Sequence, residues 1–197
     1  MTVRYVDIFA GCGGISLGLH KAGLQGLFAI EKNPDAFSTL KYNLIDTHKH
    51  FKWAPWLPVK NWNIDTLLKN KERELKSLQG TVDLVVGGPP CQGFSMAGER
   101  RASDKRNKLI HSYLDFVKLV QPRVIMFENV QGFTLKFSNS TKHKKIAYSE
   151  IVISELHKLG YTDARGEMID MSETGIQYQA VSQAISQKLL LLKSLAK

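Results

Sequence analysis

"DIFAGCGGISLG", residues 7–18, is the stretch that decides the fold, because it places glycines where an apolar strand gives way to a helix. Strand-like and helix-like segments then alternate, in the order TVRYVDIF (2–9), ISLGLHKAG (15–23), GLFAI (26–30) and PDAFSTLKYNL (34–44). This alternation is typical of a parallel sheet whose strands are joined by crossover helices. We therefore predict a Rossmann-like α/β fold, with a mostly parallel sheet and helices on both of its faces.

The alternation continues along the chain. Apolar periodicity indicates helices, and continuous apolar runs indicate buried strands. In chain order we expect a helix at 65–78, a strand at 81–86, a helix at 107–120, a strand at 123–127, a helix at 145–160 and an edge strand at 161–170. Residues 48–62 are expected to form an irregular loop. We predict one domain over 1–170 and a divergent tail over 171–197, helical from Gln177 onward.

The composition limits the class of protein. The chain has 197 residues, 43% of them hydrophobic, which suffices for one domain with its own core. Lys and Arg number 27 against 18 Asp and Glu, and the formal charge of +9 favours a polyanionic partner such as nucleic acid. With only two cysteines, neither a disulfide framework nor a metal site is expected, and a cytoplasmic location is predicted. No targeting or membrane-spanning segment is recognised.

The glycine-rich turn is a candidate ligand site. Gly11, Gly13 and Gly14 let the backbone approach a ligand closely and present the amides of a helix end to it. The pattern departs from the dinucleotide fingerprint, because Ser16 occupies the position of its last glycine. Glu31 follows the second strand at the distance where such folds bind ribose hydroxyls. The turn and Glu31 together favour an adenosine-containing ligand.

Asp65 allows two interpretations. It lies at the end of a third candidate strand, where its carboxylate could accept a hydrogen bond from an adenine amino group. It could equally be the N-cap of the helix that follows.

The segment GGPPCQGFS, residues 87–95, is a candidate catalytic loop. It follows a buried strand, so Cys91 leaves the sheet at the edge where open α/β folds bind their ligands. Pro89 and Pro90 stiffen the backbone, which suits a nucleophile. Cys12 is interpreted as a structural cysteine. The next strand ends at Glu128 and Asn129, and an acid beside a thiol suggests attack on a ring that must be protonated.

Five segments together carry a family resemblance. They are FAGCGGISLGL, AIEKNP, GGPPCQGFS, DKRNKL and FENVQGF, in that order. Their order and spacing resemble those of DNA (cytosine-5)-methyltransferases over residues 3 to about 170. The resemblance implies a Rossmann-like fold that binds S-adenosylmethionine and an enzyme that transfers its methyl group to C5 of cytosine.

The resemblance also implies roles for individual residues. Those around the cofactor are Phe9, Gly11, Cys12, Gly13, Gly14, Glu31 on the ribose, Asp65 on the adenine amino group and Pro90 beside the methyl donor. Cys91 is the nucleophile that attacks C6, Glu128 binds and protonates N3, and Asn129 orders the site.

Double-stranded DNA is the implied partner, with the target cytosine flipped out of the duplex. A basic loop after the nucleophile is expected to contact phosphates. Its cationic residues are Arg100, Arg101, Lys105, Arg106 and Lys108.

The sequence departs from the family beyond residue 170. Gly175 and Ile176 are present, but the Gln-Arg-x-Arg stretch that normally follows them is missing. The length leaves no room for a target-recognition domain or for the late helix of the family. A split enzyme completed by a second polypeptide, a truncated product and a shortened chain all fit. We therefore retain three functions: a DNA cytosine methyltransferase, an inactive cofactor-binding remnant and a tRNA cytosine methyltransferase. The glutamine after Cys91 favours DNA.

Overall fold

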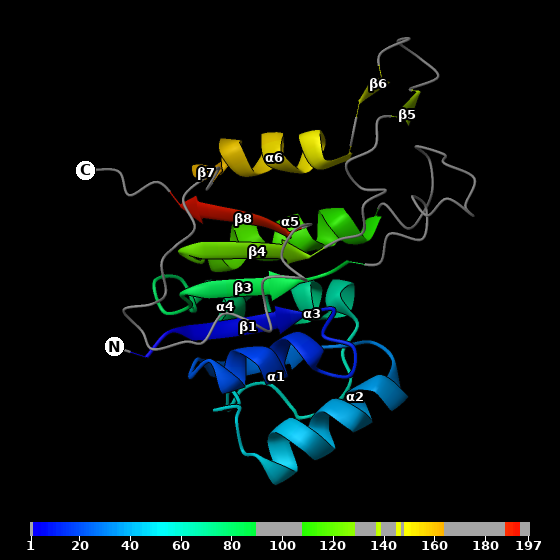
Figure 1. Ribbon diagram of the computed structural model, residues 1–197, viewed down its shortest axis with the longest axis vertical. Helices are drawn as coiled ribbons and strands as arrows, with labels where there is room; N and C mark the ends of the chain where they lie inside the picture. The colour runs from blue at the N-terminus through cyan, green and yellow to red at the C-terminus, as the bar shows by residue number, and fades with distance from the viewer. Residues whose placement is uncertain are drawn as a thin grey trace.

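The computed structural model describes residues 2–89, 108–128, 137–138, 145–146, 148–163 and 188–193. A six-stranded sheet runs through these residues in the order β2-β1-β3-β4-β8-β7 (Figure 1). Its strands are β1 Arg4–Ile8, β2 Gln25–Ile30, β3 Leu84–Gly87, β4 Val124–Glu128, β7 Tyr161–Asp163 and β8 Lys188–Lys193. Two short strands, β5 Phe137–Ser138 and β6 Lys145–Ile146, pair separately. The prediction of a mostly parallel sheet is confirmed.

The four parallel strands position the site. β2, β1, β3 and β4 are parallel neighbours, so their carboxyl ends meet at the same edge of the sheet. Ile8 and Gly87 are register partners at the ends of β1 and β3, and Gly87 is also paired with Phe127 near the end of β4. Whatever follows these strands in the sequence is therefore brought together.

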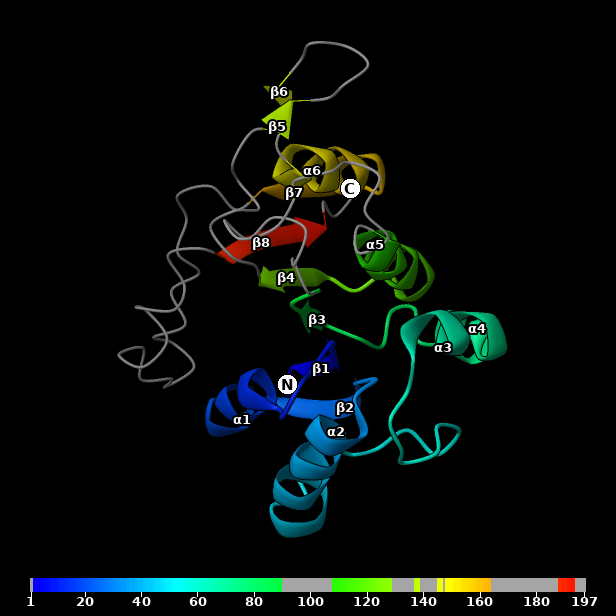
Figure 2. The ribbon, with the colours of Figure 1, turned by 90° about the vertical axis from the view of Figure 1, so that its right-hand side faces the viewer.

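Helices cover both faces, as predicted. They are α1 Gly14–Lys21, α2 Pro34–Leu40, α3 Ile64–Asn70, α4 Glu72–Lys76, α5 Lys108–Val120 and α6 Tyr148–Lys158, with a π-helix, η1, at Lys41–Thr47. Figure 2 shows α1 on one side of the sheet and α3, α4 and α5 on the other. Within the described residues, no helix is both long and apolar enough to cross a bilayer.

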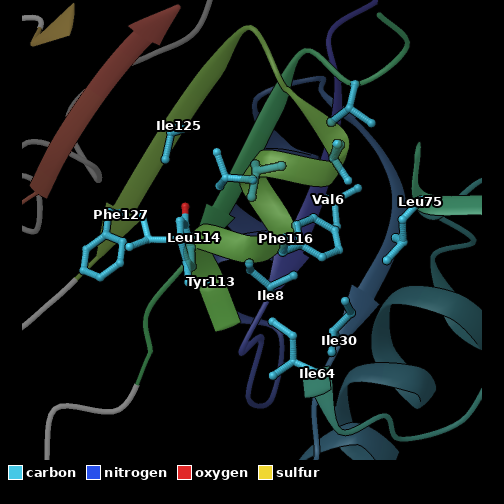
Figure 3. Close-up of a cluster of buried hydrophobic side chains, with 14 of the residues drawn as sticks. Val6, Ile8, Ile30, Ile64, Leu75, Tyr113, Leu114, Phe116, Ile125 and Phe127 are labelled. Atoms are coloured by element: carbon cyan, nitrogen blue, oxygen red, sulfur yellow. The ribbon is translucent and has the colours of Figure 1, made fainter. Parts of the chain in front are cut away.

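The larger core lies between the sheet and α5. Ile110, Tyr113, Leu114 and Val117 recur at the spacing of one helical face, and all four are buried. They pack with side chains of the central strands, as Figure 3 shows for Val6, Ile8, Ile125 and Phe127. The apolar spacing read from the sequence thus gives the face of α5 that packs against the parallel strands.

Residues 65–78 form two helices where one was expected. α3 ends at Asn70 and α4 begins at Glu72, because the backbone of Lys71 leaves the helical region with φ −129° and ψ 25°. The break lets Leu67 and Leu75 both reach full burial, which outweighs the helical preference of the polar residues between them.

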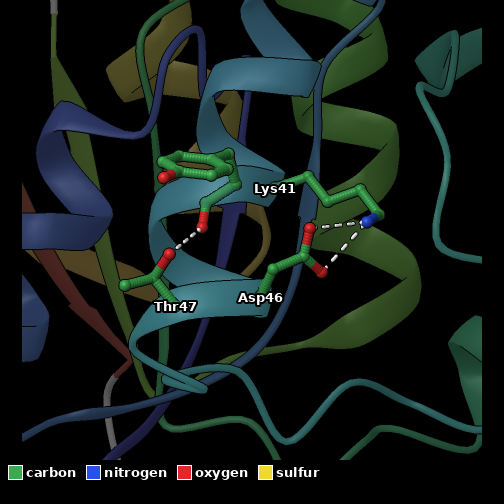
Figure 4. A network of polar contacts seen from close by, with 4 residues as sticks. Lys41, Asp46 and Thr47 are labelled. Carbon is green, nitrogen blue, oxygen red and sulfur yellow. Dashed lines mark hydrogen bonds and ion pairs between the residues drawn. The ribbon is translucent and has the colours of Figure 1, made fainter.

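The segment after α2 winds into the π-helix η1, which the apolar pattern did not indicate. The Thr47 hydroxyl donates to the carbonyl oxygen of Tyr42 at 2.7 Å, and Lys41 Nζ lies 2.7 Å from Asp46 Oδ2 (Figure 4). Leu40 and Leu44 lie on the opposite side, against the glycine turn. A Cβ at Gly13 would lie 2.9 Å from Cδ1 of Leu44, and its φ of 88° also favours glycine.

The helix predicted from Gln177 onward is wrong over Lys188–Lys193. These residues form β8, which is antiparallel to both β4 and β7. Leucine and lysine favour helices when isolated, but the free backbone groups along β4 and β7 give an extended segment hydrogen bonds on both sides. The predicted edge strand is confirmed over Tyr161–Asp163 and otherwise lies outside the described residues.

A series of hydrogen-bonded polar groups, most of them buried, links α1 to β1 and to the loop that carries His50. The Ser16 hydroxyl donates to Asp7 Oδ2 at 2.6 Å, and the Tyr5 hydroxyl donates to the Ser16 carbonyl oxygen at 3.3 Å. His50 Nε2 lies 2.7 Å from the Tyr5 oxygen, and His20 Nδ1 lies 2.7 Å from His50 Nδ1. Every contact is satisfied if His50 donates to Tyr5 and His20 donates to His50.

Asp7 and His50 in this series of polar groups have shifted pKa values. Burial raises the pKa of the Asp7 carboxyl to about 7. Burial, assisted by the neighbouring His20, lowers the pKa of His50 to about 4. Protonation of His50 at Nδ1 would also set a donor against the donor of His20. The folded protein therefore favours a neutral Asp7 and a neutral His50.

These shifts act on stability in opposite directions. The folded state keeps the Asp7 proton that the unfolded state releases, so this contribution to the free energy of unfolding is lost between about pH 4 and pH 7 as pH rises. The unfolded state takes up the His50 proton first, so that contribution is lost as pH falls from about 6.5 to about 4. The two effects offset each other in wild type.

Removing either group should reveal the contribution of the other to the pH dependence of stability. Relative to wild type, we expect Asp7→Asn to gain stability as pH rises across this window, and His50→Gln to lose it. Each difference should change by at most about 1.4 kcal/mol per pH unit. Urea unfolding across the window measures both, and variant curves that run parallel to the wild-type curve would contradict the assignment.

Candidate active site

The glycine turn is tied to the end of β2 by Glu31. The Gly11 amide donates to Glu31 Oε2 at 2.8 Å, and the Asn33 amide donates to Oε1 at 2.6 Å. Phe9, the first residue after β1, has a φ of 62°, an uncommon conformation that is often found at functional sites. Glu31 therefore lies beside the turn, as the sequence predicted.

This corner has room for a ligand. A Cβ built on Gly11 or Gly14 meets no atom within 4 Å, and Cys12 is exposed. Glu31 is half-buried, and each of its carboxylate oxygens accepts one backbone hydrogen bond. Because a carboxylate oxygen can accept more than one hydrogen bond, Glu31 can still bind hydroxyl groups.

Asp7 is a residue of this corner that the sequence analysis missed. The N-cap of α1, Gly13, has no side chain to cap the helix, and Asp7 reaches Ser16 in the first turn from β1 instead. Its Oδ1 is buried without a hydrogen-bond partner. An acidic residue inside the apolar run of β1 is the feature of the sequence from which this role of Asp7 could have been predicted. Asp7 holds α1, and hence the glycine turn, against the sheet.

Asp65 lies in the first turn of α3 rather than at the end of a strand. The N-cap is Asn63, whose Oδ1 accepts from the Thr66 amide at 3.2 Å, so the capping interpretation of Asp65 is wrong. The Asp65 carboxylate instead accepts a 2.5 Å hydrogen bond from Ser112 and lies 3.1 Å from Lys108 Nζ. The Ser112 hydrogen bond, followed by Lys108, holds the pKa of Asp65 below its usual value.

Asp65 and Glu31 are held on the same side of the molecule. The Trp62 amide donates to the Glu31 carbonyl oxygen at 2.7 Å, and the Asn61 side chain donates to the Lys32 carbonyl oxygen at 3.0 Å. These bonds join the segment before α3 to the end of β2. The structure thus brings the two predicted adenosine-binding carboxylates to the sheet edge that also carries the glycine turn.

The base of the cysteine loop touches Glu128. A Cβ at Gly88 would lie 2.5 Å from Glu128 Oε2, so the side chain of the strand-end glutamate rests against the bare backbone of Gly88. Gly87 is just as close to its neighbour, because a Cβ there would lie 2.3 Å from the Ile8 carbonyl oxygen. Glu128 is therefore beside the start of GGPPCQGFS, as the strand order predicted.

Several predicted residues lie outside the described part of the chain. They are Pro90, Cys91, Asn129, Arg100, Arg101, Lys105, Arg106, Gly175 and Ile176. Lys108 is described, and its ammonium group is paired with Asp65. Among the described residues, no group of three His, Cys, Asp or Glu side chains could hold a metal ion.

The profile of the C-5 cytosine-specific DNA methylase family matches residues 3–177. The chain belongs to this family. Among curated relatives, the type II methyltransferase M.DdeI of Desulfomicrobium norvegicum is 36% identical over 159 residues, which are 81% of this chain and 34% of that protein. M1.HphI of Haemophilus parahaemolyticus is 34% identical over 164 residues, 82% of this chain and 39% of that protein. This C-5 methylase chain thus spans less than half the length of these relatives.

Solved structures share the fold of this C-5 methylase chain. A DNA modification methyltransferase encoded within an E. coli prophage superposes with a TM-score of 0.59 at 24% identity, over 83% of this chain and 40% of that one. The S. pombe Dnmt2 methyltransferase gives a TM-score of 0.57 at 19% identity, over 99% of this chain and 50% of that one. At these identities the likeness shows the fold alone.

The close approach at Gly87 has a measurable cost. We expect Gly87→Ala to lower the free energy of unfolding by about 1–3 kcal/mol or more, because its Cβ would meet backbone that cannot move aside. Gly18→Ala, within α1 and with open space around its Cβ position, is the matched control and should be stabilising by up to about 1 kcal/mol. Equal stabilities of the two variants in urea unfolding would contradict this account.

Proposed function

We propose that this chain is the cofactor-binding and catalytic part of a DNA cytosine-5 methyltransferase. It would transfer a methyl group from S-adenosylmethionine to C5 of a cytosine flipped out of double-stranded DNA. The observation that supports the proposal is the meeting of Glu31, the glycine turn, Asp65 and Glu128 at one edge of the sheet. Membership of the family gives this arrangement its chemical meaning.

The described residues fit the adenosine part of the cofactor. Glu31 keeps free acceptor capacity for the ribose hydroxyls. Asp65 is partly exposed, with 38% of its side chain accessible to solvent, and would accept a hydrogen bond from the adenine amino group. Gly11 is hydrogen-bonded to Glu31, and Phe9 and residues 11–14 would border the ligand. When bound, the cofactor supplies an electrophilic methyl group. Pro90, next to the nucleophile in the sequence, would border that group.

Cys91 would perform the covalent step. Its thiolate forms a bond to C6 of cytosine, and the electrons of the C5–C6 double bond make C5 nucleophilic. Methyl transfer to C5 would leave S-adenosylhomocysteine as the cofactor product, and loss of the C5 proton to a base would then expel the thiolate and restore the double bond. The intact enzyme and 5-methylcytosine are then released.

Glu128 would make this attack possible. A protonated Glu128 can donate to N3 of the flipped cytosine, which withdraws electrons from the ring and favours thiolate addition at C6. Its contact with Gly88 places it beside the start of the cysteine loop. Asn129 follows Glu128 directly and would order the site, while the basic residues between 100 and 106 would contact DNA phosphates.

The assignment of Glu31 to the ribose is tested by cofactor binding. Glu31→Ala should weaken S-adenosylmethionine binding by about tenfold or more, because hydrogen bonds to a charged acceptor are lost. Isothermal titration calorimetry measures this affinity. Glu72→Ala is the control, since Glu72 is an exposed glutamate on α4 that is paired with Lys76. An unchanged affinity of Glu31→Ala would remove the ribose assignment.

The proposed methyl transfer is tested by labelling of nucleic acid. With labelled S-adenosylmethionine, the wild-type chain should label duplex DNA, and Cys91→Ser should abolish labelling because serine is a far weaker nucleophile. Transfer RNA is tested in parallel, and both substrates are tested again after adding any polypeptide encoded beside this chain. Labelling of tRNA alone would replace the DNA proposal. Cofactor binding without transfer under every condition would identify an inactive remnant.

A further inference from the structure

Helix α5 presents two donors to Asp65 from a single face. Ser112 and Lys108 are one turn apart, and their side chains reach different oxygens of the same carboxylate. Ser112 Oγ lies 2.5 Å from Asp65 Oδ1, and Lys108 Nζ lies 3.1 Å from Asp65 Oδ2. The candidate adenine acceptor is therefore held by a helix whose Lys108 was expected, from the sequence, to contact DNA.

The two donors differ in how firmly they are placed. Ser112 is buried, at 3% exposure, and its hydroxyl also lies 3.1 Å from the Lys108 carbonyl oxygen, so its position is set by the helix itself. Lys108 is 70% exposed at its side chain and belongs to a solvent-accessible ion pair. Such pairs contribute little to stability, so Lys108 can be displaced from Asp65 at small cost.

We propose that Ser112 is a positioning residue that holds Asp65 as the acceptor for the adenine amino group, and that Lys108 competes with that amino group for the same carboxylate. This inference rests on the proposed function. The Ser112 hydrogen bond uses Oδ1 and leaves Oδ2 facing the ammonium group of Lys108. An arriving amino group must share or replace the Lys108 contact. Removing the two side chains should therefore change cofactor affinity in opposite directions.

The direction of each expected change in cofactor affinity follows from the chemistry of the donor that is removed. Without the Ser112 hydroxyl, the Asp65 carboxylate can rotate, and the cofactor must bear the cost of ordering it. Without the Lys108 ammonium group, the carboxylate is no longer neutralised and becomes a stronger acceptor. A purely structural role of the α3–α5 contact would instead make both substitutions weaken binding.

Calorimetry with S-adenosylhomocysteine tests the pair. We expect Ser112→Ala to raise the Kd by about 5–10-fold and Ser112→Thr to restore it, because threonine keeps the hydroxyl donor. Lys108→Gln should lower the Kd by about 2–5-fold, the range of an exposed ion pair. Lys118→Gln, which removes an exposed charge elsewhere on α5, is the matched control and should leave the Kd unchanged.

The pH profile provides a second readout. Ser112→Ala removes the largest influence that lowers the pKa of Asp65, leaving Lys108 on α5 and Lys32 after β2 as the charges that act on it. On acidification, cofactor affinity should therefore fall at a higher pH in Ser112→Ala than in wild type. A variant that is merely less well folded would lose affinity without such a displacement of the profile.

Three outcomes separate this inference from the proposal beneath it. Failure of the wild-type chain to bind the cofactor product would overturn both. Normal wild-type binding that Glu31→Ala weakens, with an unchanged Ser112→Ala, would overturn the inference alone. A Kd for Lys108→Gln equal to or higher than the wild-type Kd would overturn the competition.

Discussion

The close approach of β3 to β1 at Gly87 is the constraint on which the rest of the structure depends. A side chain there would collide with the Ile8 carbonyl oxygen, so only a bare backbone lets the two strands run in register to their ends. A side chain at Gly88 would likewise collide with Glu128. Because these strands end together, the glycine turn, the start of the cysteine loop and the strand-end glutamate share one edge of the sheet.

Carboxylates organise this edge, and each is held by donors from a different part of the chain. Glu31 accepts backbone amides, Asp65 accepts from α5, and Asp7 accepts from the first turn of α1. The first two stay partly exposed, where a ligand can still reach them, while Asp7 is buried and favours its neutral form. Burial therefore separates the carboxylates that are available for binding from the one that supports the fold.

The sequence allowed the central strands, α5 and the position of Glu31 to be predicted, because these follow from apolar periodicity and from glycine at a strand-to-helix turn. Contacts between distant segments could not be read in the same way. The approach of Ser112 to Asp65 depends on how α5 crosses α3, and that of His50 to Tyr5 depends on an irregular loop. β8 was predicted wrongly because its conformation is decided by its neighbours rather than by its own residues.

The position of β8 also bears on how the sheet assembles. Among the described residues, β7 is attached to the sheet only through β8, which follows it in the chain but lies between it and β4. During synthesis, β7 therefore emerges before β8, with which it pairs, exists. The local strand–helix units can form early, whereas completion of this edge awaits a pairing of high sequence separation, which is typically a late and slow folding event.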